Sequence, residues 1–327
     1  MAAEEYQNWS SFRETIVIGP SGRLSAAALP ILTIKSGPFK ECTFQAIAGT
    51  TGAGNIHKQY GTNVAQRRPD ALDLIGPDYD RASAHPAERT LIICSAPRTG
   101  SYELCRFLLA AGIGVPHEYF NPSYARRLGE RLGFSQNPLE PSEVARYVAA
   151  LRRRRGQGSV FATKLQFPHF DRALRNKAGR DLFDGATVVH LFRSDAPAQY
   201  ASYRAALESG NWDFSGRPTT TPLARDPKNF DSFFGQALQE LDMLMGQDAG
   251  FRCLFTLAGI KPIFVPSAEL FADPRAIIGK IADAMRVPVN EGELEQALAL
   301  SARYGSEKKK IPSRLAEQFK RVAFGGA

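Results

Sequence analysis

From residue 89 onward, apolar and polar positions follow two alternating patterns, one typical of buried strands and one of amphipathic helices. Short apolar runs predict strands at residues 90–94, 159–164, 186–192 and 261–265. Apolar residues at helical spacing predict helices over 101–111, 141–151, 195–208, 230–257 and 277–285. Strands that alternate with helices are typical of a parallel sheet covered on both faces, so the pattern predicts an α/β fold.

Residues 1–88 show a different pattern, in which Gly, Pro, Ser and Thr interrupt short strand-like fragments at 14–18 and 29–34. The segment 50–88 is predicted as a loop or linker. We interpret residues 1–88 as an N-terminal extension, either a small β-rich unit or a partly disordered one, and residues 89–327 as the main domain.

Composition narrows the class of protein. Of the 327 residues, 43% are hydrophobic and 23% are charged, which is ordinary for a globular chain. No apolar run approaches the ~20 residues of a membrane helix, and the N-terminus lacks the apolar segment of a secretory signal. The cysteines are scattered without CxxC spacing, at Cys42, Cys94, Cys105 and Cys253. This argues against a disulfide framework or a metal site, and it predicts a cytoplasmic protein.

The net charge of +8 indicates an anionic partner: nucleic acid, a membrane surface, or a small phosphate or sulfate ligand. Two basic runs, 152–155 and 308–310, are interpreted as solvated helix ends, and the second is also suited to cover a nucleotide phosphate. Elsewhere Arg and Lys are spread along the chain without a recognised nucleic-acid motif. We therefore expect no nucleic acid partner, and a non-catalytic module that binds nucleic acid or anionic lipid is the weaker hypothesis.

The loop between the first predicted strand and helix is the best candidate site. A helix N-terminus offers free N–H groups and the positive end of the helix dipole, which bind phosphate or sulfate. Arg98 adds a forked cation, Thr99 and Ser101 add hydroxyls, and Gly100 lets the backbone approach a ligand closely. The alternative is an ordinary capped helix that follows a tight turn.

A second glycine-rich segment, at 49–54, has the glycine spacing of a nucleotide-binding P-loop. Asn55 stands where such a loop needs a lysine, so the phosphates of a nucleotide would lack a counter-charge. We assign this segment no nucleotide role. A nucleotide kinase with a P-loop-like fold stays an alternative for the whole chain, because a loop after a strand is common to both classes.

Arg193 follows the predicted strand at 186–192, where open α/β sheets bind ligands. On the next helix, Gln199 and Ser202 are three positions apart and share a face. Arg193 and Ser202 are suited to clamp a second phosphate. The alternative is that Arg193 pairs with Asp195 and that Ser202 is a small packing residue.

Glu118 lies in the segment 114–122 among Val, Tyr and Phe. We expect this apolar setting to raise the pKa of its carboxyl and make it a better proton acceptor. Lys164 ends a predicted strand at the same sheet edge, where it is suited to stabilise developing negative charge. For each residue the alternative is a surface position.

Taken in order, these segments resemble the bacterial trehalose sulfotransferase family, which transfers a sulfuryl group from 3′-phosphoadenosine 5′-phosphosulfate (PAPS) to a sugar hydroxyl. The resemblance covers about residues 89–215 and rests on CSAPRTGSYELCRFL, GVPHEYFNP, FATKLQF and HLFRSDAPAQYASYRA. It implies a P-loop-like parallel sheet flanked by helices, PAPS as co-substrate, no metal, a carbohydrate or glycolipid acceptor, and a homodimer.

The resemblance also implies roles for individual residues. It places the 5′-phosphosulfate on the first loop and helix start, at Arg98, Thr99, Gly100 and Ser101. We expect the next residue, Tyr102, to contact the donor as well. It places the 3′-phosphate on Arg193 and Ser202, and it makes Glu118 the general base. We expect Arg98 and Lys164 to assist catalysis; the role of Lys164 is our own inference.

Tyr102 departs from the family pattern, in which a small residue follows the loop, so it is expected either to crowd the site or to stack on the ligand. A protein that binds PAPS without turnover is therefore a further alternative. The sequence does not identify the acceptor. Trp212, Phe214 and Tyr124 are candidates for stacking on a sugar, with core packing as the alternative role for each.

Overall fold

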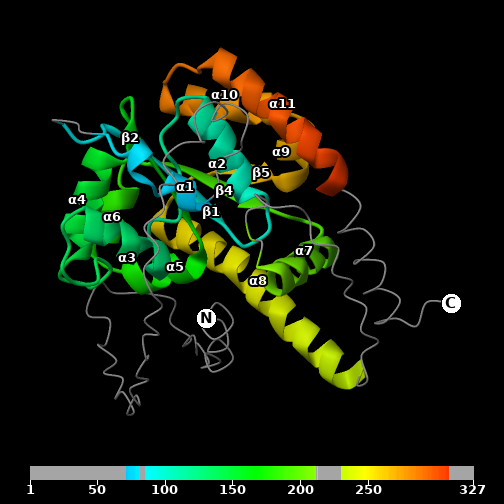
Figure 1. Ribbon diagram of the computed structural model, residues 1–327. Coiled ribbons are helices and arrows are strands. Elements are labelled where there is room, and N and C mark those ends of the chain that lie inside the picture. The colour runs from blue at the N-terminus through cyan, green and yellow to red at the C-terminus, as the bar shows by residue number, and fades with distance from the viewer. Residues whose placement is uncertain (1–70, 82–84, 211, 213–229, 309–327) are drawn as a thin grey trace, which may run out of the picture. The chain divides into compact units, whose positions relative to one another are not determined.

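Figure 1 shows the computed structural model of the chain, which describes residues 71–81, 85–210, 212 and 230–308. All of these residues belong to the unit Arg68–Ala327. Several predicted features lie outside the described residues: the fragments 14–18 and 29–34, the glycine-rich segment 49–54, Phe214, and residues 309–310 of the second basic run.

Within the described part of the chain, a five-stranded sheet has the strand order β2-β3-β1-β4-β5. The strands are β1 (Arg89–Ser95), β2 (Gly156–Gln157), β3 (Val160–Leu165), β4 (Thr187–Phe192) and β5 (Ile263–Pro266). β1 pairs in parallel with β3 and β4, β4 pairs in parallel with β5, and β2 is antiparallel to β3. The strands predicted from the apolar runs are confirmed, and so is the α/β fold class.

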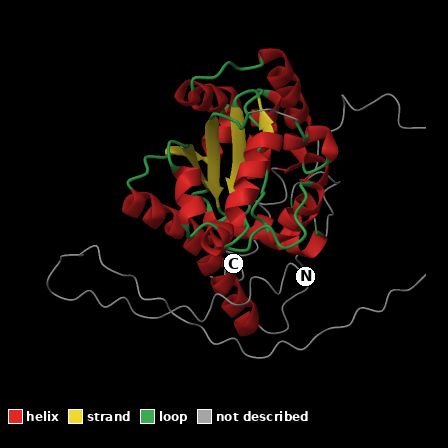
Figure 2. Cartoon of the chain, turned by 90° about the vertical axis from the view of Figure 1, so that its left-hand side faces the viewer, coloured by secondary structure: helices red, strands yellow, loops and turns green. Residues whose placement is uncertain are grey.

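Helices cover both faces of this sheet, as the view turned by 90° shows (Figure 2). One core contains residues of α3 (Pro122–Arg131), α4 (Val144–Arg154), α5 (Phe167–Ala173), α6 (Lys177–Phe183) and α8 (Phe230–Ala258). The other contains residues of α2 (Ser101–Ala110), α9 (Ser267–Ala272), α10 (Pro274–Met285) and α11 (Glu291–Lys308). A further helix, α7 (Ala196–Ser209), packs against α8.

β1 supplies side chains to both cores. Leu91 and Ile93 pack with α2 and α10, whereas Ile92 and Cys94 pack with α4 and α8, and all four are fully buried. A strand that is buried on both faces has a continuous apolar run without polar alternation, and this is why the run at 90–94 was recognisable in the sequence.

The structure also contains short elements that the sequence analysis did not predict. The predicted loop at 50–88 includes α1 (Ala71–Leu74) and a single 3₁₀ turn, η3 (Pro77–Tyr79). α5 and α6 have seven residues each, too few for a helical period to stand out. The helix predicted from residue 141 begins at Val144, because residues 141–143 form a turn.

The order of the strands places a switch point between β1 and β4. The chain leaves β1 toward β3 on one side of the sheet and leaves β4 toward β5 on the other. In open α/β sheets, ligands bind outside the carboxyl ends of the strands at such a point. The loop at 96–100, called the β1–α2 loop below, and Arg193 both follow strands that meet there.

Candidate active site

Hydrogen bonds from neighbouring elements hold the β1–α2 loop. Gln199 of α7 donates from Nε2 to the Pro97 carbonyl at 2.8 Å, and Thr99 Oγ1 donates to the Ala96 carbonyl at 3.1 Å. The Ser267 hydroxyl, at the start of α9, lies 2.5 Å from the Thr99 carbonyl oxygen. The carbonyls of Ala96, Pro97 and Thr99 are therefore engaged by the protein.

Two residues of this loop have left-handed backbone conformations. Gly100, the N-cap of α2, has φ 90°, and Arg98 has φ 66°. A Cβ atom on Gly100 would lie 2.7 Å from the Phe271 ring, so any other residue would need a strained backbone and a shift of that ring. A non-glycine residue at positive φ is strained, and such strain is concentrated at ligand sites.

The Arg98 side chain reaches toward α7. Its Nε donates to Ser202 Oγ at 3.0 Å, and its guanidinium also donates to the Trp212 carbonyl. Arg193 donates to the Arg98 carbonyl at 3.4 Å, and burial lowers the pKa of its guanidinium below the ordinary value. The structure thus brings Arg98, Ser202 and Arg193 together.

Asp195, the N-cap of α7, positions these contacts. Asp195 accepts a hydrogen bond from the Ala198 backbone N–H at 3.0 Å, and Pro197 lies in the first turn. The carboxylate of Asp195 therefore stabilises the helix end. Gln199 and Ser202 both contact the β1–α2 loop, which confirms that they share a face.

A second group of polar residues surrounds Glu118. His117 and Thr163 form a parallel bridge, and the Lys164 backbone N–H donates to the His117 carbonyl at 2.9 Å. The segment before α3 therefore runs beside the end of β3. This pairing places Glu118 next to Lys164, although 46 positions separate them in the sequence.

The Glu118 carboxylate is only 3% exposed and is fully engaged. Oε1 accepts from the Lys164 ammonium and from Gln166 Nε2 at 3.2 Å, while Oε2 accepts from Asn121 Nδ2 at 3.1 Å. Burial raises the pKa of this carboxyl, but the charge of Lys164, with a smaller contribution from His169, lowers it to about 2. The expectation of a raised pKa is therefore wrong, because the sequence did not show that Lys164 contacts Glu118.

Lys164 connects this group to α2. Its Nζ lies 3.7 Å from the centre of the Tyr102 ring, in the first turn of that helix. Burial raises the pKa of the Tyr102 hydroxyl well above its ordinary value, so the phenol stays neutral. Tyr102 was expected to crowd the site or to stack on a ligand; in the structure it stacks on the ammonium of Lys164.

Sequence reasoning missed His169. This side chain lies in α5, is 7% exposed, and has a buried Nδ1 without a hydrogen-bond partner among the described residues. Burial lowers the pKa of its imidazole to about 4, so it is neutral at neutral pH. Its position five residues after Lys164, just beyond a strand that leads into the site, is the signal that could have found it.

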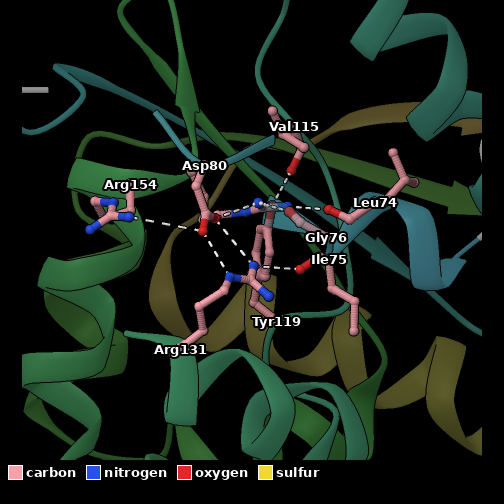
Figure 3. Close-up of polar contacts among 9 residues, drawn as sticks. Leu74, Ile75, Gly76, Asp80, Val115, Tyr119, Arg131 and Arg154 are labelled. Carbon is pink, nitrogen blue, oxygen red and sulfur yellow. Dashed lines mark hydrogen bonds and ion pairs between the residues drawn. The ribbon is translucent and has the colours of Figure 1, made fainter. Parts of the chain in front are cut away.

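A network of charged side chains contacts Tyr119, the residue after Glu118 (Figure 3). Arg155 donates to Asp80 Oδ1 at 2.8 Å and to the Tyr119 hydroxyl at 3.2 Å. Arg131 donates to Asp80 Oδ2 at 2.8 Å. The Tyr119 hydroxyl in turn donates to the Val115 carbonyl at 2.5 Å. These contacts, called the Asp80 network below, fix the residue that directly follows Glu118.

The Asp80 network corrects one prediction. Residues 152–155 were expected to form a solvated helix end, yet the Arg155 side chain is fully buried. Arg153 and Arg154 are exposed, as predicted. Arg155 differs because Asp80, 75 positions earlier in the sequence, supplies a counter-charge inside the protein.

Two of the residues proposed to stack on a sugar contact protein rings. Tyr124 lies edge-to-face on His117 with ring centres 4.6 Å apart, and Trp212 does so on Tyr203 at 5.7 Å. In the part of the chain that the structure describes, no cluster of three or more His, Cys, Asp or Glu residues is arranged to hold a metal ion. None of the described helices is both long enough and apolar enough to cross a membrane.

Two known sulfotransferases are similar to this chain. The trehalose 2-sulfotransferase of Mycolicibacterium smegmatis is 26% identical over 113 residues, which are 35% of this chain and 39% of that enzyme. The alignment therefore spans less than half of the relative's length. The sulfotransferase domain of the Synechococcus PCC 7002 olefin synthase has a TM-score of 0.36 and 17% identity, over 66% of this chain and 80% of that domain.

The profile of the Stf0 sulphotransferase family matches residues 90–307. This range includes the β1–α2 loop, Glu118, Lys164 and Arg193, and it confirms the resemblance found in the sequence. The chain belongs to the Stf0 sulphotransferase family.

Proposed function

We propose that the protein transfers a sulfuryl group from PAPS to a hydroxyl of a carbohydrate or glycolipid acceptor. The observation that carries this proposal is the proximity of two groups of residues at one sheet edge. Arg98, Ser202 and Arg193 offer cations and a hydroxyl for the phosphates of a donor. Glu118 and Lys164 offer a carboxylate and an ammonium for the transfer itself.

The donor fits the chemistry of the first group. The N-terminus of α2 and the β1–α2 loop suit the 5′-phosphosulfate, because free N–H groups and a helix dipole favour an anion. Arg193 and Ser202 suit the 3′-phosphate that distinguishes PAPS from ATP. The net charge of +8 favours the approach of such an anion.

The proposed transfer is an in-line displacement. The acceptor oxygen attacks sulfur, the bond between sulfur and the bridging oxygen breaks, and its electron pair leaves with 3′-phosphoadenosine 5′-phosphate. The hydroxyl proton passes to the Glu118 carboxylate. Lys164 stabilises the charge that develops on the leaving oxygen. A general base of this kind contributes about 10²–10⁴ in rate.

The acceptor class rests on the relative and on the resemblance. The relative that aligns with this chain is a trehalose 2-sulfotransferase, which supports a sugar hydroxyl as acceptor. We also propose a reducing, cytoplasmic location, supported by the free thiols of Cys94, Cys105 and Cys253.

Calorimetric titration tests the donor. 3′-Phosphoadenosine 5′-phosphate is compared with adenosine 5′-phosphate and ATP, because only the first carries the 3′-phosphate. We expect it to bind at least about tenfold more tightly, and we expect Arg193→Ala to remove this preference. Arg175→Ala is the matched control, since Arg175 lies outside the site in an exposed pair with Asp171. Equal or tighter binding of ATP would contradict the proposal and favour a nucleotide kinase.

A transfer assay tests turnover. Radiolabelled PAPS is incubated with a panel of sugars, trehalose included, and sulfated product is counted. Glu118→Ala is expected to lower kcat by about 10²–10⁴. Full activity of this variant would contradict the assignment of Glu118 as the general base. Donor binding with no transfer to any acceptor of the panel would favour a PAPS-binding protein without turnover.

A further inference from the structure

As the structure describes it, Glu118 is a weak proton acceptor. Both of its carboxylate oxygens are engaged, and its pKa is lowered to about 2. A base works best when its pKa lies near the operating pH. At least one of these contacts must therefore be released before Glu118 can take a proton from an acceptor.

The position of Lys164 points to that change. Its ammonium contacts the Glu118 carboxylate, and the same ammonium lies 3.7 Å from the centre of the Tyr102 ring. Tyr102 directly follows Ser101, the first residue of α2, where the phosphosulfate is proposed to bind. One flexible side chain therefore lies between the proposed base and the proposed donor site.

We propose that Lys164 acts as a switch. Its ammonium pairs with the ionised Glu118 carboxylate until the donor binds, and it then moves to the phosphosulfate. This inference rests on the proposed function. A lysine ammonium is a compact charge on a long flexible stem, so it can exchange one anion for another by rotating its own bonds. The Tyr102 ring offers it a weak contact on the way, without a formal charge that would hold it.

The other groups that face Glu118 do not replace this charge. They are His169 from α5, His117 from the same segment, and Tyr102 and Cys105 from α2. Burial lowers the pKa of His169 to about 4 and raises that of Cys105 to about 12, so both are neutral at neutral pH. Lys164 is the largest favourable charge acting on Glu118.

Loss of the ammonium would leave Glu118 buried at 3% exposure, with the amides of Gln166 and Asn121 as its described hydrogen-bond donors. Burial and the negative charge of the donor would then both raise the pKa of Glu118. The base becomes competent only after the donor has bound. The acceptor reacts second, because until then the Glu118 carboxylate is paired with the Lys164 ammonium.

Proton uptake on nucleotide binding tests the switch without turnover. The probe is 3′-phosphoadenosine 5′-phosphate, titrated at pH 5 in two buffers that differ in ionisation enthalpy. The wild-type protein is expected to take up at least about half a proton more than Glu118→Gln, because the sources that remain in Glu118→Gln, the phosphates of the nucleotide and the His169 imidazole, are present in both proteins. Lys164→Met is expected to lose the same excess. Without the ammonium, its buried Glu118 already carries a proton before the nucleotide binds.

The outcomes separate the two proposals. Failure of the nucleotide to bind to the wild-type protein would overturn both the proposed function and the switch. Binding with the same proton uptake in wild type and Glu118→Gln would overturn the switch and leave sulfuryl transfer standing. If Glu118→Gln does not fold, the comparison of wild type with Lys164→Met decides alone: equal uptake overturns the switch, and a loss in the variant supports it.

Discussion

The guanidinium of Arg155 lies 2.8 Å from the carboxylate of Asp80, although 75 positions separate the two residues in the sequence. Arg155 is entirely withdrawn from water, so its charge depends on protein partners. Asp80 belongs to the described part of the N-terminal segment, and Arg155 follows α4. The contact therefore ties a segment that precedes the sheet to the end of α4, just before β2.

Asp80→Asn should strongly destabilise the fold, because it leaves the Arg155 charge buried without its partner. Breaking a buried ion pair costs about 3–5 kcal/mol. Lys177→Met is the matched control, because it breaks an exposed pair with Asp181 that is worth less than about 1 kcal/mol. Urea unfolding of the full chain measures both. Losses of equal size would show that the Asp80 network does not stabilise the fold.

Gly100→Ala should be more harmful than Gly133→Ala. Both glycines have positive φ, at 90° and 83°, which costs a side chain about 1–2 kcal/mol. At Gly100 a Cβ also meets the Phe271 ring, whereas nothing lies within 4 Å at Gly133. Unfolding free energies measure the difference, and adding Phe271→Ala to Gly100→Ala should recover the steric part. No recovery would show that the ring is not what excludes a side chain there.

Tyr102→Phe should retain turnover, because the ring that contacts Lys164 is kept. Tyr102→Leu should lower kcat by about tenfold, which corresponds to the loss of one cation–π contact with the ammonium. Steady-state rates with saturating donor and acceptor measure the two variants. Similar rates in both would show that the ring does not position Lys164.

His169→Gln should flatten the acid side of the stability profile. The folded protein holds the pKa of His169 at about 4, against an ordinary value of 6.5, so between these values the unfolded chain binds more protons. Stability conferred by the neutral imidazole is therefore complete above pH 6.5 and is lost as the pH falls through this range. Unfolding at several pH values should show a slope smaller by up to about 1.4 kcal/mol per pH unit in the variant. An unchanged dependence of the unfolding free energy on pH would contradict the lowered pKa of His169.

The sequence predicted the parts of the fold that depend on local patterns. β1 was recognisable because a strand buried on both faces is apolar throughout, and α7 because Asp195 and Pro197 mark its beginning. α5 was not predicted, because seven residues are too few to show a helical period. Arg98, Lys164 and Arg193 were proposed from their places at strand ends, which is where parallel sheets bind ligands.

The charges of the site could not be predicted in the same way. The pKa of Glu118 depends on Lys164, and the burial of Arg155 depends on Asp80; both partners are distant in the sequence. The neighbouring residues in the sequence are apolar around Glu118 and basic around Arg155. Only the folded structure shows which opposite charge each one meets.

The hydroxyl of Ser267 lies within hydrogen-bond distance of two carbonyl oxygens, those of Thr99 and Phe192. These atoms belong to the turn after β1 and to the end of β4, and Ser267 itself follows β5. The Ser267 hydroxyl oxygen thus links the turn after β1 and the end of β4 to the residue that follows β5. Under the proposed function, the donor meets a backbone that these hydrogen bonds already hold, so its binding requires little rearrangement of the polypeptide.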